Sequence, residues 1–187
     1  MLVPALILLL LYPSGERPGK RLLLTGLLFS WAGDIFLLFE SNAASFFIIG
    51  LVCFLTTHIF YIIYFLSVRS ANPSLLKKQP LLVLLVAGYG IALVSFLFPH
   101  LGELKIPVII YAGFICTMLI CSLHAWPKLN RASAVCYLLG ALLFVLSDSL
   151  LAVNKFYQAF AYAQVGIILT YCAAQYFIVR GFLKLDT

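Results

Sequence analysis

The sequence predicts an all-α, polytopic transmembrane helical bundle of about seven spans. Of its 187 residues, 64% are hydrophobic and only 10% are charged, whereas soluble domains are about half apolar and a quarter charged. The apolar residues also gather in blocks close to the roughly 20 residues that a helix needs to cross a bilayer. These blocks use nearly the whole chain, so residues 1–187 are expected to form a single transmembrane domain. Any chemistry must then occur inside the membrane or at its edge.

Proline, glycine and charged clusters separate seven apolar blocks. In order they are Met1–Tyr12, Leu22–Phe39, Phe46–Val68, Leu81–Phe98, Ile106–Leu123, Ala134–Val153 and Phe160–Phe182. Backbone groups in lipid must be hydrogen-bonded internally, and continuous blocks of this length achieve that only as helices. The short alternating segments typical of a membrane β-barrel are missing from the sequence.

The first block, Met1–Tyr12, is shorter than the other six. It has neither the basic start nor the small-residue cleavage site of a signal peptide. We therefore expect a half-span or a tilted helix. The second block begins after a cluster of Pro, Gly and charged residues, and the polar loop Arg69–Pro80 separates the third block from the fourth.

The net charge of +6 is explained by the positions of the basic residues. Loops on one side of the predicted membrane hold Arg17, Lys20, Arg21, Arg69, Lys77, Lys78, Lys128, Arg131, Arg180 and Lys184, and the other side holds Lys105 and Lys155. Basic loops stay in the cytoplasm, so the C-terminus is expected there and the N-terminus outside. The protein is expected in the cell membrane if it is bacterial and in the endoplasmic reticulum if it is eukaryotic. No nucleic-acid partner is needed to explain the charge.

The cysteines and histidines do not form a ligand set. The five cysteines lie in apolar segments and are expected to be free thiols. His58, His100 and His124 fall at three different depths, so we expect neither a metal nor a cofactor.

Two aspartates, Asp34 and Asp148, lie inside predicted spans, where an ionisable side chain costs about 2.5–3.5 kcal/mol on insertion scales. Each is about five residues from the outer end of its block. At about 1.5 Å per residue, the two carboxyls should therefore lie at a similar depth. If they meet, repulsion would leave one protonated and one ionised, as in an acid/base pair. Each also suits a structural hydrogen bond between helices, and the residues alone leave both readings open.

Other polar side chains in the spans form a second set of candidates. His58 and Tyr61 are three residues apart and Tyr171 and Gln175 four apart, so each pair shares a helix face. Asn154 and Lys155 end the sixth block, where the lysine suits a lipid phosphate or simply reaches the interface. These six are the candidate substrate-binding residues, although packing between helices would explain the first four equally well.

A set of residues spread over nearly the whole chain carries a resemblance to a known family. They are Gly33-Asp34, Leu37, Gly50, Phe54, His58, Tyr61, Gly140-Ala141, Phe144, Ser147-Asp148, Asn154-Lys155-Phe156, Tyr171 and Ala174-Gln175. This set resembles the lysoplasmalogenase-like (YhhN) family of membrane proteins, most specifically from Ser147 to Phe156. The family usually has eight predicted spans, and Met1–Tyr12 looks like the second of them.

The resemblance implies a lipid hydrolase. Characterised members of the family cleave the vinyl-ether bond of lysoplasmalogen, giving a fatty aldehyde and a glycerophospho-ethanolamine or -choline. The aspartates that match Asp34 and Asp148 are regarded as catalytic. Protonation of the vinyl ether, followed by addition of water, needs a desolvated acid, a nearby carboxylate and polar groups that hold the water. We expect Asp148 to be the acid, because Phe144 and Leu151 share its helix face, and Asp34 to be the base.

The expected partners are a single-chain ether phospholipid and the bilayer, and the oligomeric state stays open. Three alternatives also remain. The same aspartates suit another ether or amide lipid, and buried carboxylates also relay protons in transporters, although the sequence shows no inverted repeat. A seven-helix receptor is the third, but no lysine lies at a helix centre to hold a retinal.

Overall fold

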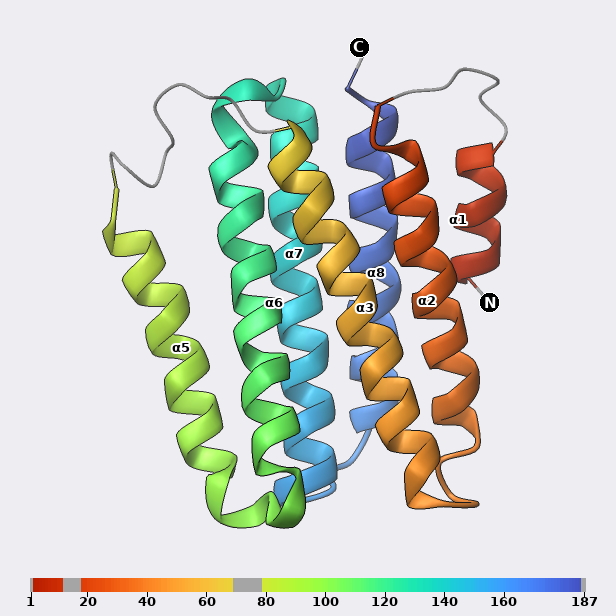
Figure 1. The fold of residues 1–187 in the computed structure, drawn as a ribbon, viewed down its shortest axis with the longest axis vertical. Coiled ribbons are helices and arrows are strands. Elements are labelled where there is room, and N and C mark those ends of the chain that lie inside the picture. The colour runs from red at the N-terminus through yellow and green to blue at the C-terminus, as the bar shows by residue number, and fades with distance from the viewer. Residues whose placement is uncertain (1, 12–17, 69–78, 186–187) are drawn as a thin grey trace.

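Helices that run along the long axis of the molecule build most of the described chain (Figure 1). The computed structural model describes residues 2–11, 18–68 and 79–185. Their helices are α1 (Leu2–Leu11), α2 (Lys20–Leu38), α3 (Ala44–Val68), α5 (Leu81–Leu97), α6 (Lys105–Ala125), α7 (Arg131–Ala152) and α8 (Ala163–Leu183). Short 3₁₀ turns cover Phe98–His100, Gly102–Leu104 and Trp126–Lys128, and a π-helical turn, Val153–Tyr157, extends α7. The prediction of an all-α bundle is confirmed.

Six of the described helices are long and apolar enough to cross a membrane. The exception is α1, whose ten residues extend only about 15 Å. It lies beside α2 and reaches only about half of the bundle's height (Figure 1). The first block is therefore a half-length helix, as expected, and the predicted seven spans become six full spans and this shorter one.

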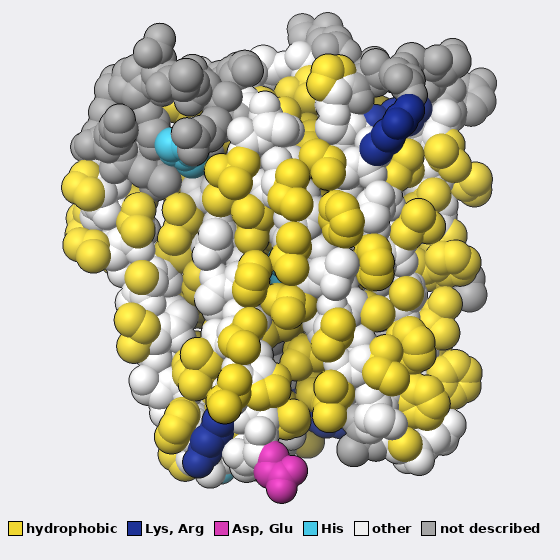
Figure 2. All heavy atoms as spheres, viewed as in Figure 1, with side chains coloured by type: hydrophobic (Ala, Val, Ile, Leu, Met, Phe, Trp, Pro, Cys, Tyr) yellow, Lys and Arg dark blue, Asp and Glu magenta, His cyan; other side chains and the backbone are white. Residues whose placement is uncertain are grey.

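The flank of the bundle is suited to lipid. Figure 2 shows hydrophobic side chains over most of one face, with charged groups only toward its two ends. Leu84, Ile91 and Ile106 are 67%, 68% and 70% exposed. Side chains this apolar are stable at such exposure when hydrocarbon, rather than water, surrounds them.

Two antiparallel pairs of helices, α2 with α3 and α7 with α8, form the most extensive contacts, and α3 also packs on α6. Small residues allow the close approach of α7 and α8. A Cβ added at Gly140 would lie 3.0 Å from the backbone oxygen of Ala174 and 2.7 Å from Cγ1 of Ile178. Because lipid gives helices no hydrophobic reason to associate, such tight contacts supply much of the packing energy in a membrane.

The described basic residues follow the predicted asymmetry. Lys20, Arg21, Arg131, Arg180 and Lys184 lie at the helix ends that are uppermost in Figure 1, which we call the basic end. Lys105 and Lys155 lie at the opposite end, which we call the site end. Arg17, Arg69, Lys77 and Lys78 fall outside the described residues. The orientation of the termini and the membrane of residence stay predictions.

Candidate active site

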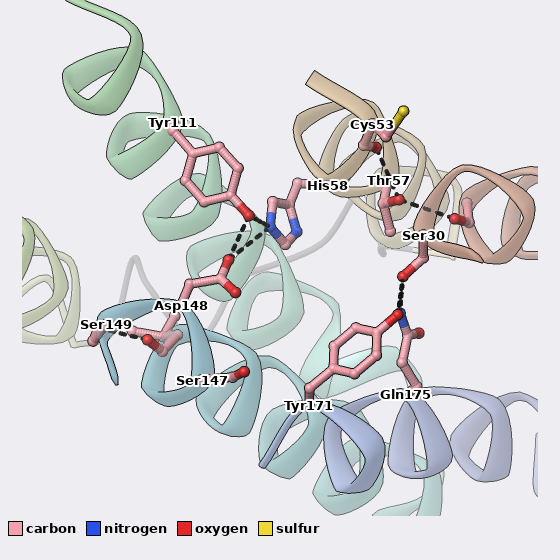
Figure 3. A network of polar contacts seen from close by, with 12 residues as sticks. Ser30, Cys53, Thr57, His58, Tyr111, Ser147, Asp148, Ser149, Tyr171 and Gln175 are labelled. Atoms are coloured by element: carbon pink, nitrogen blue, oxygen red, sulfur yellow. Dashed lines mark hydrogen bonds and ion pairs between the residues drawn. The ribbon is translucent and has the colours of Figure 1, made fainter. Parts of the chain in front are cut away.

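Asp148 lies about one turn before the end of α7, toward the site end, and is the centre of a group of three polar side chains from three helices. The Tyr111 hydroxyl of α6 donates to Asp148 Oδ2 at 2.6 Å. His58 Nε2 of α3 lies 3.2 Å from the same oxygen and 3.0 Å from the Tyr111 hydroxyl. Figure 3 shows the three side chains converging. The His58 side chain is fully buried and that of Asp148 is 15% exposed.

The surroundings of Nδ1, the second ring nitrogen of His58, indicate which nitrogen carries the hydrogen. Nδ1 is buried and has no hydrogen-bond partner among the described residues. A hydrogen on Nδ1 would be an unpaired buried donor, which is costly. We therefore assign the hydrogen of the neutral ring to Nε2, from which it points at Asp148 and Tyr111. Both neighbours of Asp148 are then donors, and both of these bonds fall on Oδ2.

Asp34, on α2, ends a second network, in which every hydrogen bond runs in one direction. Tyr61 donates to Gln175 Oε1 at 2.6 Å, and Gln175 Nε2 donates to Ser30 Oγ at 2.7 Å. Tyr171 donates to Asp34 Oδ2 at 3.0 Å. The Ser30 and Tyr171 hydroxyls are 2.6 Å apart. Because the single hydroxyl hydrogen of Tyr171 is used on Asp34, Ser30 must donate to Tyr171.

This chain of donors, which we call the Asp34 relay, leaves the Asp34 carboxyl as its final acceptor. Each donor polarises the next, so the chain is stronger than its separate bonds. A charged carboxylate accepts such bonds without supplying a hydrogen of its own. The relay thus supplies Asp34 with a hydrogen bond from the Tyr171 hydroxyl.

Two phenylalanines lie between the networks. The Phe144 ring packs edge-on against His58, Tyr61 and Tyr171, with centroids 5.0, 6.3 and 5.7 Å away. The Phe54 ring packs edge-on against Tyr171 at 5.7 Å and lies within 2.9 Å of the position of a Cβ added at Gly33. The glycine beside Asp34 therefore allows this ring to approach α2.

A cavity of about 40 Å³ opens beside Asp148. Its lining residues are Leu37, Phe47, Leu51, Phe54, Tyr111, Asp148, Leu151, Ala152 and Phe156. The volume is enough for a few water molecules. Asp148 and Tyr111 supply the polar side chains of this lining, and Asp34 is not part of it. Phe54 connects the cavity with the Asp34 relay, since its ring lines the cavity and packs on Tyr171.

The last two candidates lie at the site end, away from both networks. Lys155 Nζ pairs with Glu40 Oε2 at 2.9 Å and lies 4.7 Å from the centroid of the Phe47 ring. The Asn154 side-chain oxygen accepts a 3.4 Å hydrogen bond from the Phe160 backbone and so holds the turn before α8. Of the sequence-predicted residues, the structure joins His58 to Asp148, and it joins Tyr61, Tyr171 and Gln175 to Asp34.

No group of three or more His, Cys, Asp or Glu side chains in the described part of the chain is arranged to hold a metal ion. The side chains gathered around the two aspartates are hydroxyl, imidazole and amide groups, which suit proton transfer and hydrogen bonding.

Tyr111 and Ser30 were not predicted from the sequence, although each has a sequence feature that could have identified it. A tyrosine in a span needs a partner for its hydroxyl, and Tyr111 is six residues from the site-end start of α6, a depth similar to that of Asp148. Ser30 lies one helical turn before Asp34, on the same face. Glu40 was also missed, because it follows the end of α2 and resembles an ordinary loop carboxylate.

Comparison with known proteins matches this arrangement to one family. The chain is 31% identical to lysoplasmalogenase TMEM86A of Bos taurus, over 95% of this chain and 70% of the bovine protein. It is 32% identical to a lysoplasmalogenase of Mycobacterium bovis, over 91% and 63% of the two chains, and 33% identical to human lysoplasmalogenase TMEM86B, over 92% and 67%. The chain thus spans about two thirds of the length of these relatives, and no solved structure matches it. Since the YhhN family model matches residues 1–182, the chain belongs to the YhhN family.

Proposed function

We propose that this protein is a lysoplasmalogenase, which hydrolyses the vinyl-ether bond of a lysoplasmalogen to a fatty aldehyde and a glycerophospho-ethanolamine or -choline. Relatives named lysoplasmalogenase support this substrate. The observation that carries the proposal is Asp148 in the wall of a largely apolar cavity, with both of its hydrogen bonds on one oxygen.

In this proposal Asp148 is the general acid. With Oδ2 as the carbonyl oxygen that accepts from Tyr111 and His58, the hydrogen of the neutral acid resides on Oδ1. It is transferred to the β-carbon of the vinyl ether, and the ether oxygen shares the resulting positive charge as an oxocarbenium ion. The two donors on Oδ2 then stabilise the Asp148 carboxylate that remains.

Asp34 is the general base for the second half of the reaction. In this proposal Asp34 is ionised, with the Tyr171 hydroxyl donating to its Oδ2, and it accepts a proton from the water that adds to the oxocarbenium carbon. The resulting hemiacetal collapses to aldehyde and alcohol. Phe54 stands between the cavity and the Tyr171–Asp34 end of the relay, so rotation of its side chain is the step that opens the cavity to Asp34. The Phe54 ring also favours a cation in the cavity.

The test is aldehyde release from two lipids by the purified protein. Lysoplasmalogen and its saturated alkyl-ether analogue share head group and chain length, but protonation of carbon activates only the vinyl ether. We expect aldehyde from the first and none from the second. No release from lysoplasmalogen would overturn the proposal. Hydrolysis of an amide lipid instead, or proton-coupled flux into proteoliposomes without hydrolysis, would each favour one of the alternatives.

A further inference from the structure

An ion pair joins two helix ends where the cavity approaches the site end. Glu40 follows the end of α2 and Lys155 lies in the π-helical turn after α7, and their charged atoms are 2.9 Å apart. Each side chain is 37% exposed. We call these two residues the Glu40–Lys155 pair.

The pair lies next to aromatic residues that line the cavity. The Lys155 ammonium lies 4.7 Å from the centroid of the Phe47 ring, and the Phe47 ring packs edge-on against Phe156 at 5.9 Å. Both phenylalanines line the cavity, together with Asp148. Lys155 is seven residues beyond Asp148, which corresponds to about 10 Å along the helix. The pair therefore lies next to the phenylalanines of the cavity lining, farther toward the site end than Asp148.

A ligand that carries both charges can replace the contact between Glu40 and Lys155. A surface ion pair contributes little net stability, because water solvates both groups well. A ligand that carries its own negative and positive group can replace each partner with an equivalent one. A phosphate then takes the place of the Glu40 carboxylate on Lys155, and the positive charge of an ammonium takes the place of that of Lys155 beside Glu40.

We propose that the Glu40–Lys155 pair is a head-group site for a zwitterionic phospholipid, in which Lys155 binds the phosphate and Glu40 binds the ammonium. This inference rests on the proposed function and adds Glu40 as a determinant of substrate class. The geometry agrees with the substrate. At single-bond lengths of about 1.5 Å, the extended atoms between phosphorus and the vinyl ether span about 8 Å, which is comparable with the rise of about 10 Å along the helix from Asp148 to Lys155.

The experiment compares two vinyl-ether lysolipids, only one of which carries a positive charge beyond the phosphate. One carries phosphocholine, and the other carries a bare phosphate. For Glu40→Gln we expect KM for the phosphocholine lipid to rise roughly fivefold, while KM for the phosphate lipid should not rise, because its phosphate no longer competes with Glu40 for Lys155. For Lys155→Gln we expect KM to rise for both lipids. In all cases kcat should stay within about twofold, because neither residue reaches the reacting atoms.

Matched controls lie at the same end of the bundle, outside the cavity lining. Glu103 lies in the 3₁₀ turn Gly102–Leu104, and Lys105 begins α6 and packs over Phe98. Glu103→Gln and Lys105→Gln should leave both KM values unchanged. If Glu40→Gln raises KM equally for the two lipids, or for neither, Glu40 does not recognise the amine and the inference is overturned.

Binding of the saturated alkyl-ether analogues separates this inference from the proposed function. Titration calorimetry with the phosphocholine and phosphate forms needs no turnover. If the wild-type protein cleaves no vinyl ether but Glu40→Gln weakens binding of the phosphocholine form alone, the head-group site stands and the proposed function fails. If cleavage occurs without this selectivity, only the head-group site is lost.

Discussion

The Tyr111 hydroxyl and Asp148 Oδ2 lie 2.6 Å apart, although 37 residues and a change of helix separate them. A phenol that donates to a carboxyl in a low-dielectric site stabilises the negative charge left when that carboxyl gives up its proton. In the proposed reaction Tyr111 therefore acts at the moment of proton transfer, while His58 supplies the second donor.

Removing this donor tests the role of Tyr111. We expect Tyr111→Phe to lower kcat about 10- to 100-fold, because a hydrogen bond to a charged group contributes about 1.5–3 kcal/mol. The measurement is the initial rate of aldehyde release. Tyr89→Phe is the matched control, since Tyr89 donates at 2.8 Å to Ser149, the next residue after Asp148. Equal losses in the two variants would show that Tyr111 only supports packing.

The two carboxyls are tested by isosteric amides. Asp148→Asn and Asp34→Asn should each reduce kcat at least about 100-fold, since general acid–base catalysis contributes about 10²–10⁴. An amide keeps the shape and an acceptor oxygen but transfers no proton. Thermal melting in detergent shows whether each variant is folded. A folded variant that retains its activity removes that aspartate from the mechanism.

The direction of the Asp34 relay is tested at Ser30, which lies between Gln175 and Tyr171. Ser30→Ala should reduce kcat about fivefold with KM unchanged, because loss of one neutral hydrogen bond costs about 1 kcal/mol. Ser30→Thr restores a hydroxyl and should recover most of the rate. As a control, Tyr64→Phe removes the buried hydroxyl contact with Tyr137, which belongs to neither aspartate network, and should spare kcat. A threonine variant as slow as the alanine one would argue against the relay.

The contact of α7 with α8 is tested at Gly140. Gly140→Ala should destabilise the protein by about 1–3 kcal/mol, because the new Cβ would lie 3.0 Å from the backbone of Ala174. Gly113→Ala is the control, as nothing lies within 4 Å of its added Cβ, and alanine favours a helix by about 0.5–1 kcal/mol over glycine. Melting temperatures in detergent should fall for the first and not for the second. If both rise, α7 and α8 do not approach at Gly140.

Much of the fold follows from composition and the spacing of apolar blocks. The seven described helices match the seven blocks within a few residues at each end. The short first block predicted a half-span or a tilted helix, and the structure shows a half-length helix of ten residues, too short to cross the hydrocarbon. Asp34 and Asp148 were found because a carboxyl in such a block is costly and needs a reason. The family was recognised from the same polar positions, and the family match confirms it.

Other features depend on how the helices pack. Helix periodicity reports which residues share a face of one helix, but not which helix lies opposite that face. The hydrogen bonds from Tyr111 to Asp148 and from Gln175 to Ser30 join different helices, so residue spacing within one helix could not predict them. The cavity likewise lies beside Asp148 and not Asp34, and the Phe54 ring that lines it also packs over Gly33, the residue before Asp34.

The sequence by itself determined that this chain is a membrane-spanning helical bundle, where its helices begin and end to within a few residues, and which two carboxyls lie inside its spans. These properties follow from the free-energy cost of placing backbone polar groups and charges in lipid, which depends on the sequence of each segment by itself. Only the tertiary structure decided which donors each carboxyl receives, and that Glu40 stands beside Lys155. Those properties come from contacts between segments far apart in the chain, where the side chains of several helices must fit one another at once.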